Sequence, residues 1–377
     1  MQVRKIDLNK REDVEQFIQF PYDLYRGCPQ WVPPLKSDER LMLNPNKYHF
    51  YRHSVADFFV VESGGAKGET LGRIAAIDNR RANEHNNSHM AQFYFFEAID
   101  DAQVAGALFD AVLDWATSRG LNRLVGPQGL LRADGLGLLV EGFEYTPAPG
   151  IPYNYAYYDA LMTGVGLVKE RDYVSAYLSG GYRPPERVFA LAEKVKKRSG
   201  FWIQTFRSKR ELRALVPGIK RIYNESFSDV PGCYPIDDGE VAILADRFLS
   251  IADPRLIKLV MKGDEVAGFL FAFPDITPGL QKAQGRLWPT GWYHLLRAFK
   301  QTNGISVNGM GLLPQYQGVG APAILYAEMF NTIQDMHFHF EHVDLAQIEE
   351  YNTKSLAEIR GMGGKLYKRH RIYQRDI

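Results

Sequence analysis

The segment that most constrains the fold joins an apolar strand, a proline, a glycine-bearing loop and a helix near the C-terminal end of the chain. The strand is predicted over Val307–Leu313, and Pro314 ends it because proline has no N–H to donate to a neighbouring strand. The polar loop that follows contains Gly318 and Gly320, and apolar residues recur at helical spacing from Ala321. The N–H groups of such a loop and of the first helical turn point at one spot, where the helix dipole favours an anion. Because glycine lets a phosphate approach that backbone with no Cβ in the way, the segment predicts a phosphate-binding site.

Three families of phosphate-binding loop share parts of this arrangement. A P-loop needs a lysine and a hydroxyl after its last glycine, and Gly320 is followed by Ala321-Pro322, which excludes it. A Rossmann motif fits the letters, since residues 318–323 form G-x-G-x-x-A and Asp344 would be the ribose acid. That fold needs several more βα units, however, and only about fifty residues follow the motif. The structural alternative is a glycine turn that merely joins a strand to a helix.

The third family is indicated by Gln315-x-x-Gly318-x-Gly320, which matches the Q/R-x-x-G-x-G/A signature of the GNAT superfamily of acyl-CoA-dependent N-acyltransferases. The sequence downstream resembles the same superfamily. It contains a strand predicted over 338–346, a helix opened by Asn352, a glycine turn and a last strand. The resemblance covers residues 202–377. It implies an α/β fold with a mixed sheet (α+β) that takes acetyl-CoA or another acyl-CoA as cofactor.

The resemblance also implies roles for particular residues. The backbone at the end of the strand would meet the pantetheine and the acyl oxygen, the loop N–H groups would bind the pyrophosphate, and an asparagine side chain would hold the cofactor arm. The cofactor-binding residues are therefore predicted to be Leu312, Leu313, Gln315, Gln317, Gly318, Val319, Gly320, Ala321 and Asn352.

Acyl transfer to an amine also needs a base, and an acid that protonates the leaving thiolate. Glu350 is predicted as the base and Tyr351 as the acid, because both follow the strand beside the expected thioester. The alternative for Glu350 is a solvated residue before a helix. The chain departs from the family in one place: the helix that often carries a tyrosine acid has Ile359 and Arg360 there instead.

The order of elements in the first half of the chain repeats in the second half. Residues 154–166 and 352–364 each hold an asparagine, a short helix and a glycine turn, over the same 12 positions (166 − 154 and 364 − 352). The predicted organisation is a degenerate GNAT-like domain over 1–180, a linker helix over 181–200 and a GNAT domain with the CoA loop over 201–377. The whole chain resembles a tandem-GNAT bacterial family of poorly defined function.

The first copy has no glycine loop at the matching point. It has Ile99-Asp100-Asp101, which would place two carboxylates at the helix start where a pyrophosphate would bind. The first copy is therefore predicted to be non-catalytic.

Composition excludes several other classes. Hydrophobic content of 45% and charged content of 24% are typical of a soluble globular protein, and no apolar run approaches membrane-spanning length. The net charge of +1 argues against nucleic acid, and so against a Fem-type aminoacyltransferase, which uses aminoacyl-tRNA. Without a secretory signal, Cys28 and Cys233 are expected to be reduced thiols in a cytoplasmic protein. A local cluster of His337, His339 and His342 has no converging partner in sequence, so no metal site is predicted.

An insert over 274–304 interrupts the second copy. It combines aromatic and basic residues in an amphipathic pattern, which predicts a helix packed on the first copy or, alternatively, a lid or a membrane-surface element. The sequence as a whole predicts an acyl-CoA-dependent N-acyltransferase whose acceptor is a small-molecule or lipid-like amine. Some relatives of the family are thought to acylate a sphingoid base. The rival hypothesis is a non-catalytic CoA- or acyl-binding module.

Overall fold

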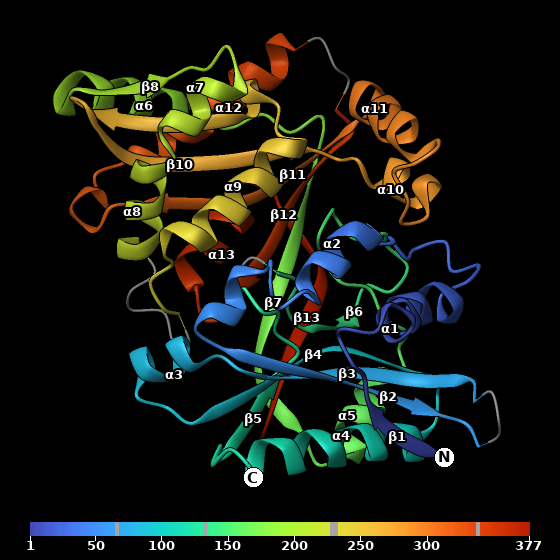
Figure 1. The fold of residues 1–377 in the computed structure, drawn as a ribbon. Helices are drawn as coiled ribbons and strands as arrows, with labels where there is room; N and C mark the ends of the chain where they lie inside the picture. The colour runs from blue at the N-terminus through green and yellow to red at the C-terminus, as the bar shows by residue number, and fades with distance from the viewer. Residues whose placement is uncertain (65–67, 132–133, 227–232, 337–339) are drawn as a thin grey trace. The chain divides into compact units, whose positions relative to one another are not determined.

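The computed structural model describes residues 1–64, 68–131, 134–226, 233–336 and 340–377 (Figure 1). They form two compact units. Unit 1 comprises 1–174, 276–298 and 368–377, and unit 2 comprises 175–275 and 299–367. Two long strands, β7 (Val168–Ser179) and β13 (Lys365–Asp376), therefore each contribute residues to both units. Among the described residues, no helix is both long and apolar enough to cross a membrane.

Unit 1 is a sheet with helices on both faces. Its strands follow the order β1-β2-β3-β4-β5-β13, then β7, with β6 paired to β13. The strands are β1 (Gln2–Lys5), β2 (Val55–Glu62), β3 (Thr70–Asp78), β4 (Met90–Ala98), β5 (Arg123–Gly126) and β6 (Leu138–Glu141). The helices are α1 (Arg11–Leu24), α2 (Lys36–Met42), α3 (Arg80–Asn86), α4 (Ala102–Thr117) and α5 (Tyr158–Gly164), with a 3-10 turn at His49–Arg52.

The core of unit 1 follows from helical and strand periodicity. The face of α4 that carries Val104, Leu108, Val112 and Trp115 is buried, as its spacing predicts. Figure 1 shows α4 and α5 on one face of the sheet and α1 and α2 on the other. On that second face, Phe17 of α1 packs edge-on against Phe58 at 5.4 Å between ring centroids.

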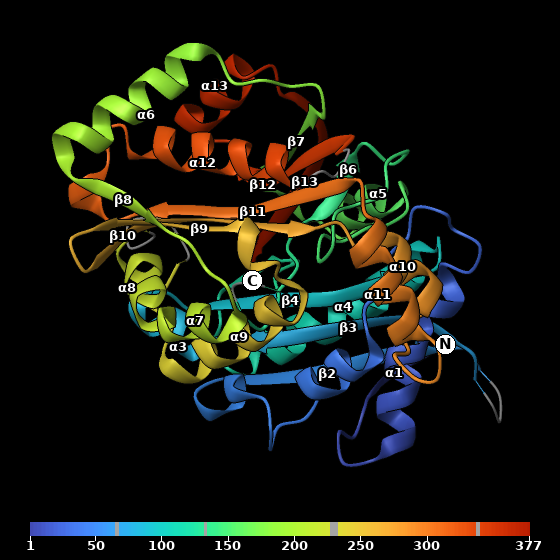
Figure 2. The same cartoon turned by 90° about the horizontal axis from the view of Figure 1, so that it is seen from above.

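Unit 2 repeats the plan. Its strands follow the order β7-β12-β11-β10-β9-β8. The strands are β8 (Phe201–Gln204), β9 (Ile257–Lys262), β10 (Glu265–Pro274), β11 (Gly304–Leu312) and β12 (His342–Glu349). The helices are α6 (Glu186–Ser199), α7 (Lys209–Ala214), α8 (Val216–Ser226), α9 (Asp238–Ile251), α12 (Ala321–Asp335) and α13 (Thr353–Gly361), with 3-10 turns at Pro254–Leu256 and Pro314–Tyr316. Figure 2 shows α6 and α12 on one face of the sheet and α7, α8 and α9 on the other.

The central strand of each unit carries a β-bulge. In unit 1, β4 has one extra residue relative to β3 near Phe95, whose φ is +51°. In unit 2 the central strand is β11, and its bulge faces β10. Gly309 of β11 pairs with Phe271 and Val307 pairs with Ala272, so that Asn308 is the extra residue. Each central strand pairs in parallel with the next strand over only its first three or four residues. Beyond that point the two strands are no longer paired, and unit 2 has its glycine loop at this end.

The predicted helix–turn–strand repeat is present in both halves. The turns are made by left-handed glycines, Gly166 and Gly363, each with φ of +79°. Strands β7 and β13 both have 12 residues and start 197 positions apart (365 − 168 = 197), one fewer than the shift of 198 expected from Gly166 and Gly364. The division into two copies over 1–180 and 201–377 remains a prediction, because the compact units interleave these ranges.

Most of the insert, residues 276–298, belongs to unit 1. It forms α10 (Thr277–Ala283) and α11 (Gly291–Gln301), and residues 276–298 cluster with the first half of the chain. Gln281 Nε2 donates to the Pro29 carbonyl at 2.7 Å, and the Lys36 N–H donates to the Gly285 carbonyl at 2.9 Å. The prediction that the insert packs on the first copy is confirmed.

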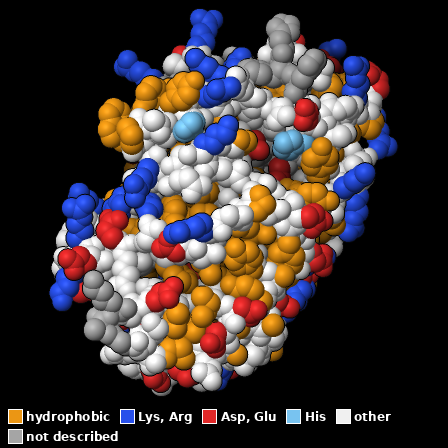
Figure 3. Space-filling model, turned by 90° about the vertical axis from the view of Figure 1, so that its right-hand side faces the viewer, with side chains coloured by type: hydrophobic (Ala, Val, Ile, Leu, Met, Phe, Trp, Pro, Cys, Tyr) orange, Lys and Arg blue, Asp and Glu red, His pale blue; other side chains and the backbone are white. Residues whose placement is uncertain are grey.

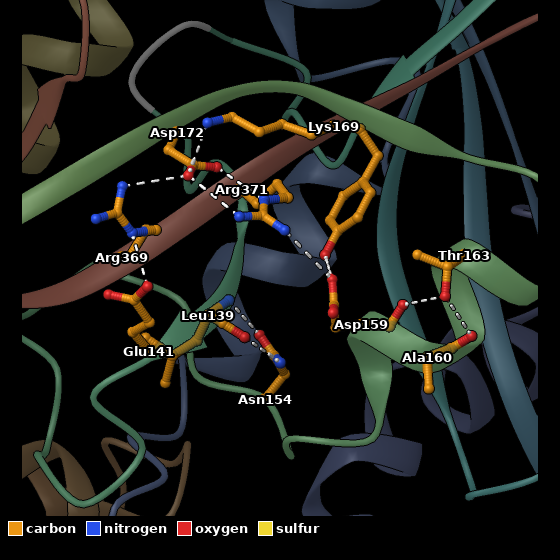
Figure 4. A network of polar contacts seen from close by, with 11 residues as sticks. Leu139, Glu141, Asn154, Asp159, Ala160, Thr163, Lys169, Asp172, Arg369 and Arg371 are labelled. Carbon is orange, nitrogen blue, oxygen red and sulfur yellow. Dashed lines mark hydrogen bonds and ion pairs between the residues drawn. The ribbon is translucent and has the colours of Figure 1, made fainter.

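The last strand of the chain is held in unit 1 by a polar network (Figure 4). Asp172 of β7 is buried and accepts hydrogen bonds from Arg371 at 2.9 Å and Arg369 at 3.3 Å, and it also pairs with Lys169 at 3.1 Å. Burial of the Asp172 carboxylate raises its pKa, but the hydrogen bonds from Arg371 and Lys169 outweigh this and lower it. In the same network, Tyr373 donates to Asp159 of α5.

Candidate functional site

The loop after β11 has the backbone shape predicted from its glycines. Leu312 ends the strand, and Gly318 and Gly320 have φ of +75° and +87°, in the left-handed region that favours glycine. Helix α12 then begins at Ala321, and no side chain caps its N-terminus. In the first turn of α12 the Ala321 N–H is left for another partner, whereas Pro322 has no N–H and the Ala323 N–H donates to the Gly320 carbonyl at 3.1 Å.

Four consecutive N–H groups are available in this loop. Within the part of the chain that the structure describes, the N–H groups of Gly318, Val319, Gly320 and Ala321 have no hydrogen-bond partner. The N–H of Gln317 differs, because it donates to the Pro314 carbonyl at 3.2 Å. Of the five N–H groups predicted to bind the pyrophosphate, those of residues 317–321, the last four are therefore available.

The two glycines have different surroundings. A Cβ added to Gly318 would meet no atom within 4 Å, so the backbone there faces open space. A Cβ added to Gly320 would lie 2.9 Å from Val195 Cγ2 of α6, so that position is closed by packing. Gly318 is therefore where an anion can approach, whereas Gly320 brings α12 close to α6.

The end of β11 presents backbone groups to the unpaired side of the strand. The Leu313 N–H donates to the Ala267 carbonyl of β10 at 3.0 Å. Since groups alternate along a strand, the Leu312 N–H points the opposite way, beyond the last β11–β12 pair at Val307 and Leu345. Leu312 and Leu313 were both predicted to meet the acyl donor through their backbone. The Leu312 N–H points to the unpaired side of β11, whereas the Leu313 N–H is hydrogen-bonded to β10. The Leu312 carbonyl accepts a hydrogen bond from Ser226 Oγ at 2.7 Å.

The predicted catalytic residues lie in the turn between β12 and α13. Glu350 is half-buried and directly follows the strand, and the Tyr351 side chain is 68% exposed. Asn352 is the N-cap of α13, where its Oδ1 accepts from the Ser355 N–H at 3.1 Å. The Asn352 side chain, predicted to hold the cofactor arm, thus uses its oxygen to cap a helix. On α13 itself, Ile359 is buried and offers no proton.

One polar contact of the loop had no signal in the sequence. Tyr316 Oη donates to Glu265 Oε2 at 2.7 Å, and Arg221 donates to the other oxygen of Glu265 at 2.6 Å. The hydrogen bond from Tyr316 lowers the pKa of Glu265, and Arg221 lowers it further. Because Tyr316 and Glu265 are 51 positions apart, only the fold brings them together.

Of the histidine cluster, only His342 is described, and His337 and His339 lie outside the described residues. The Asp275 carboxylate, 3.8 Å from His342 Nε2, raises the pKa of this imidazole. The ring also stacks on Tyr177 at 5.8 Å. Asp344, the ribose acid of the Rossmann alternative, is buried in β12 and accepts a hydrogen bond from Tyr367.

The corresponding helix start in unit 1 is closed. Asp101 is the N-cap of α4, and its carboxylate accepts from the N–H groups of Gln103 at 2.7 Å and Val104 at 3.4 Å. Of the two carboxylates predicted at this helix start, Asp101 is the one that caps the helix. An anion would be repelled there and would find these donors in use.

The fold and the uncapped glycine loop define a tandem GNAT architecture, that is, the acyl-CoA N-acyltransferase fold repeated in one chain. A tandem GNAT protein from the clavulanic acid biosynthesis pathway superposes with a TM-score of 0.59 at 11% identity, over 100% of this chain and 98% of that one. A GCN5-related glucosamine N-acetyltransferase region of a fungal multi-domain β-N-acetylglucosaminidase gives a TM-score of 0.56 at 12% identity, over 99% of this chain and 38% of that one. The resemblance and the fold class predicted from the sequence are confirmed.

Two curated proteins resemble the chain along nearly its full length. Protein YghO of Escherichia coli K12 is 26% identical over 98% of this chain and 94% of its own length. Bacterial ceramide synthase of Caulobacter vibrioides is 26% identical over 97% of this chain and 95% of its own length. No family model matches the chain.

Proposed function

We propose that the chain is an acyl-CoA-dependent N-acyltransferase that binds its acyl donor at the loop before α12. The observation that carries the proposal is the set of four adjacent N–H groups at an uncapped helix start, beside a glycine that faces open space. A pyrophosphate fits such a site because it offers several acceptor oxygens and negative charge to donors and to a helix dipole. Gly318, Val319, Gly320 and Ala321 would hold it.

The reacting end of the donor would lie along the unpaired edge of β11. When bound, acyl-CoA supplies an activated thioester carbonyl. The Leu312 N–H would orient that carbonyl and stabilise the negative charge that develops on its oxygen. Glu350 would accept the proton of the attacking amine, and Tyr351 would donate one to the departing sulfur.

The acceptor proposed for this site is a long-chain amine. The Caulobacter relative is a ceramide synthase by name, and ceramide is an N-acylated sphingoid base. Likeness over nearly the full length of both chains supports a substrate of the same chemical class. The half-buried Glu350 at the end of β12 would then meet the amine of such a molecule.

An acyl-transfer assay tests the proposed function. The protein is incubated with acetyl-, hexanoyl- or palmitoyl-CoA and with a panel of short and long-chain amines, and free thiol is followed together with the N-acyl product. We expect thiol release that depends on a long-chain amine. Thiol release without an N-acyl product would indicate hydrolysis and overturn the transferase assignment.

A non-catalytic CoA-binding module is the second candidate, and a specific observation favours it. The helix that carries a tyrosine acid in much of the family has the buried Ile359 here, and Tyr351 is mostly exposed to solvent. Binding of CoA with no turnover of any donor and amine in the panel would support this candidate over the enzyme.

A further inference from the structure

The insert exposes an unusual concentration of large apolar side chains. Fifteen large hydrophobic residues of the described chain are exposed, and five of these lie within ten consecutive positions of unit 1. These five form what we call the insert face: Leu287, Trp288, Trp292, Tyr293 and Leu296, which are 41%, 78%, 45%, 51% and 53% exposed. The remaining ten are spread along the chain. Clustered exposure of this kind marks an interaction surface, whereas single exposed apolar residues need no explanation.

The insert face is held firmly from behind. Helix α10 packs closely on α11, since a Cβ on Gly279 would lie 2.7 Å from the Ala298 Cβ. The turn before α11 is closed by the Trp292 N–H, which donates to the Leu287 carbonyl at 2.8 Å, and by Trp292 Nε1, which donates to the Pro289 carbonyl at 2.8 Å. The aromatic side chains therefore project from a rigid support.

Positive charge lies next to the insert face. At about 100° per residue, Trp292 and Leu296 form one edge of the outer surface of α11, and Arg297 lies on its other edge. Residues 276–301 contain four cationic side chains, Lys282, Arg286, Arg297 and Lys300, and no aspartate or glutamate. Figure 3 turns the side that carries α10 and α11 toward the viewer and shows hydrophobic side chains gathered on it, with Lys and Arg as well as Asp and Glu side chains around them.

A basic pocket adjoins this face within unit 1. It is a hollow of about 670 Å³ whose wall includes Leu287 and Trp288 of the insert. Four cationic side chains and one carboxylate line it: Arg11, Lys36, Arg40, Arg286 and Glu15. Glu15 is already paired with Arg40 at 2.7 Å, and Lys36 is buried with its ammonium 4.2 Å from the centre of the Tyr22 ring. The pocket thus carries an excess of positive charge beside two exposed apolar side chains.

We propose that the insert face docks on the surface of a bilayer that contains anionic phospholipid, with a headgroup phosphate in the basic pocket. Tryptophan and tyrosine concentrate at the boundary between headgroups and acyl chains, where an apolar ring and a polar edge are both satisfied. Arginine and lysine next to them match the negative surface of such a membrane. A segment without a single acidic residue has the charge complementarity that this occupant requires, and its apolar side chains supply the insertion.

Vesicle cosedimentation tests the proposal with the full chain and no CoA. We expect binding to vesicles of phosphatidylcholine mixed with phosphatidylglycerol, weak binding to phosphatidylcholine alone, and loss of binding as salt is raised. The double substitution Trp288→Ala, Trp292→Ala should lower the partition coefficient about tenfold or more, because two inserted rings are lost.

A matched control is Trp202→Ala in unit 2. The Trp202 side chain is 43% exposed and its Nε1 donates to the Gly263 carbonyl at 3.1 Å, so it resembles Trp292 in exposure and in hydrogen bonding. For charge, Arg286→Glu should weaken binding to anionic vesicles, whereas Arg210→Glu, an exposed arginine of unit 2, should not. Melting temperatures of all variants show whether each is folded.

Three results would overturn the proposal. The first is no cosedimentation of the folded wild type with anionic vesicles. The second is equal binding by the Trp288/Trp292 variant and by Trp202→Ala. The third is a lipid-free dimer of the wild type that the double substitution abolishes, since the insert face would then be an interface between copies. None of these readouts depends on acyl transfer, so failure here leaves the proposed function untouched.

Discussion

The starts of α4 and α12 occupy corresponding places in the two units, but only the N–H groups at the start of α4 are capped by a side chain. Asp101 caps α4 with its own carboxylate, at 2.7 Å from the Gln103 N–H. At α12 the chain instead makes a loop with Gly318 and Gly320, and no side chain caps the helix. The same fold therefore has a helix start capped by a carboxylate in unit 1 and an uncapped helix start in unit 2, where we propose that an anion binds.

The same contrast extends to the two asparagines of the repeat. Asn154 is buried, and its side chain bonds to the Leu139 N–H at 2.7 Å and to the Leu139 carbonyl at 3.1 Å. Asn352 is exposed and caps α13. A tyrosine directly precedes both asparagines, but the residue before that tyrosine is Glu350 in the second copy and Pro152 in the first. In unit 1 the asparagine of the repeat is buried and bonded to a neighbouring strand. This supports assigning acyl transfer to unit 2.

The largest expected effect comes from the base. Glu350→Gln should lower kcat by about 10²–10⁴-fold with little change in CoA affinity, because the amine then loses its proton acceptor. Steady-state kinetics with the best amine of the panel measures this. If kcat is unchanged, Glu350 is a solvated residue before a helix and the base lies elsewhere.

A smaller effect is expected from the acid, and the repeat supplies its control. Tyr351→Phe should lower kcat chiefly on the alkaline side of the pH profile. A CoA thiol, with a pKa near ~8.5 by analogy with cysteine, is a good enough leaving group to react slowly without an acid. Tyr153→Phe changes the matching tyrosine of the first copy and should leave the profile as in the wild type. Equal effects of both substitutions would remove Tyr351 from the mechanism.

The two long strands carry complementary charges at matching positions, Asp172 on β7 and Arg369 on β13, 197 positions apart (369 − 172 = 197). Asp172→Asn should lower the free energy of unfolding by about 1–3 kcal/mol at neutral pH, because three cations lose a buried partner. Glu141→Gln is the control, since this 63% exposed carboxylate pairs with the same Arg369 at 3.1 Å and should contribute less than about 1 kcal/mol.

Urea unfolding at several pH values sharpens this prediction. The pKa of Asp172 is lower in the folded protein than in the unfolded chain, where it is about 3.9. The Asp172 carboxylate therefore stabilises the fold fully above the unfolded-state pKa, and this stabilisation is lost as the pH falls through the lower folded-state pKa. The difference between wild type and Asp172→Asn should therefore shrink in strong acid. A difference that stays constant down to the lowest pH would contradict the ion-pair explanation.

The smallest effect is expected at the closed helix start. Asp101→Ala removes the cap of α4 and should cost about 1 kcal/mol in thermal or urea unfolding. It should not create a CoA site, because unit 1 has no glycine loop to present its N–H groups. If this variant bound a second CoA, the cap alone would account for the difference in CoA binding between the two units.

Local pattern was enough to predict much of the fold and of the loop. Periodicity identified α12, the glycines identified the backbone shape before α12, and Pro314 marked the end of β11. Helix α9 was missed although Asp237 and Glu240 form a capping box that the sequence spells out.

Other features depend on contacts that no local pattern encodes. The placement of β13 in unit 1 is fixed by pairing with β5 and by the partners of Asp172, which lie about 200 positions away. The contact of Tyr316 with Glu265 and the use of Asn352 as a helix cap likewise follow from tertiary geometry. The candidate site was therefore predicted at its glycine loop and only in outline elsewhere.

Calorimetric titration of CoA into Gly318→Ala and Gly363→Ala tests the central claim most directly. Both glycines belong to unit 2, have φ of +75° and +79°, and would place a Cβ with no atom within 4 Å, so both substitutions carry a similar strain of about 1–2 kcal/mol. Only Gly318 lies where an anion would approach the N–H groups before α12. We predict one CoA per chain for the wild type and for Gly363→Ala, with affinity at least about tenfold weaker for Gly318→Ala. Unchanged affinity in Gly318→Ala, or two CoA molecules per wild-type chain, would contradict a single CoA site at the loop before α12.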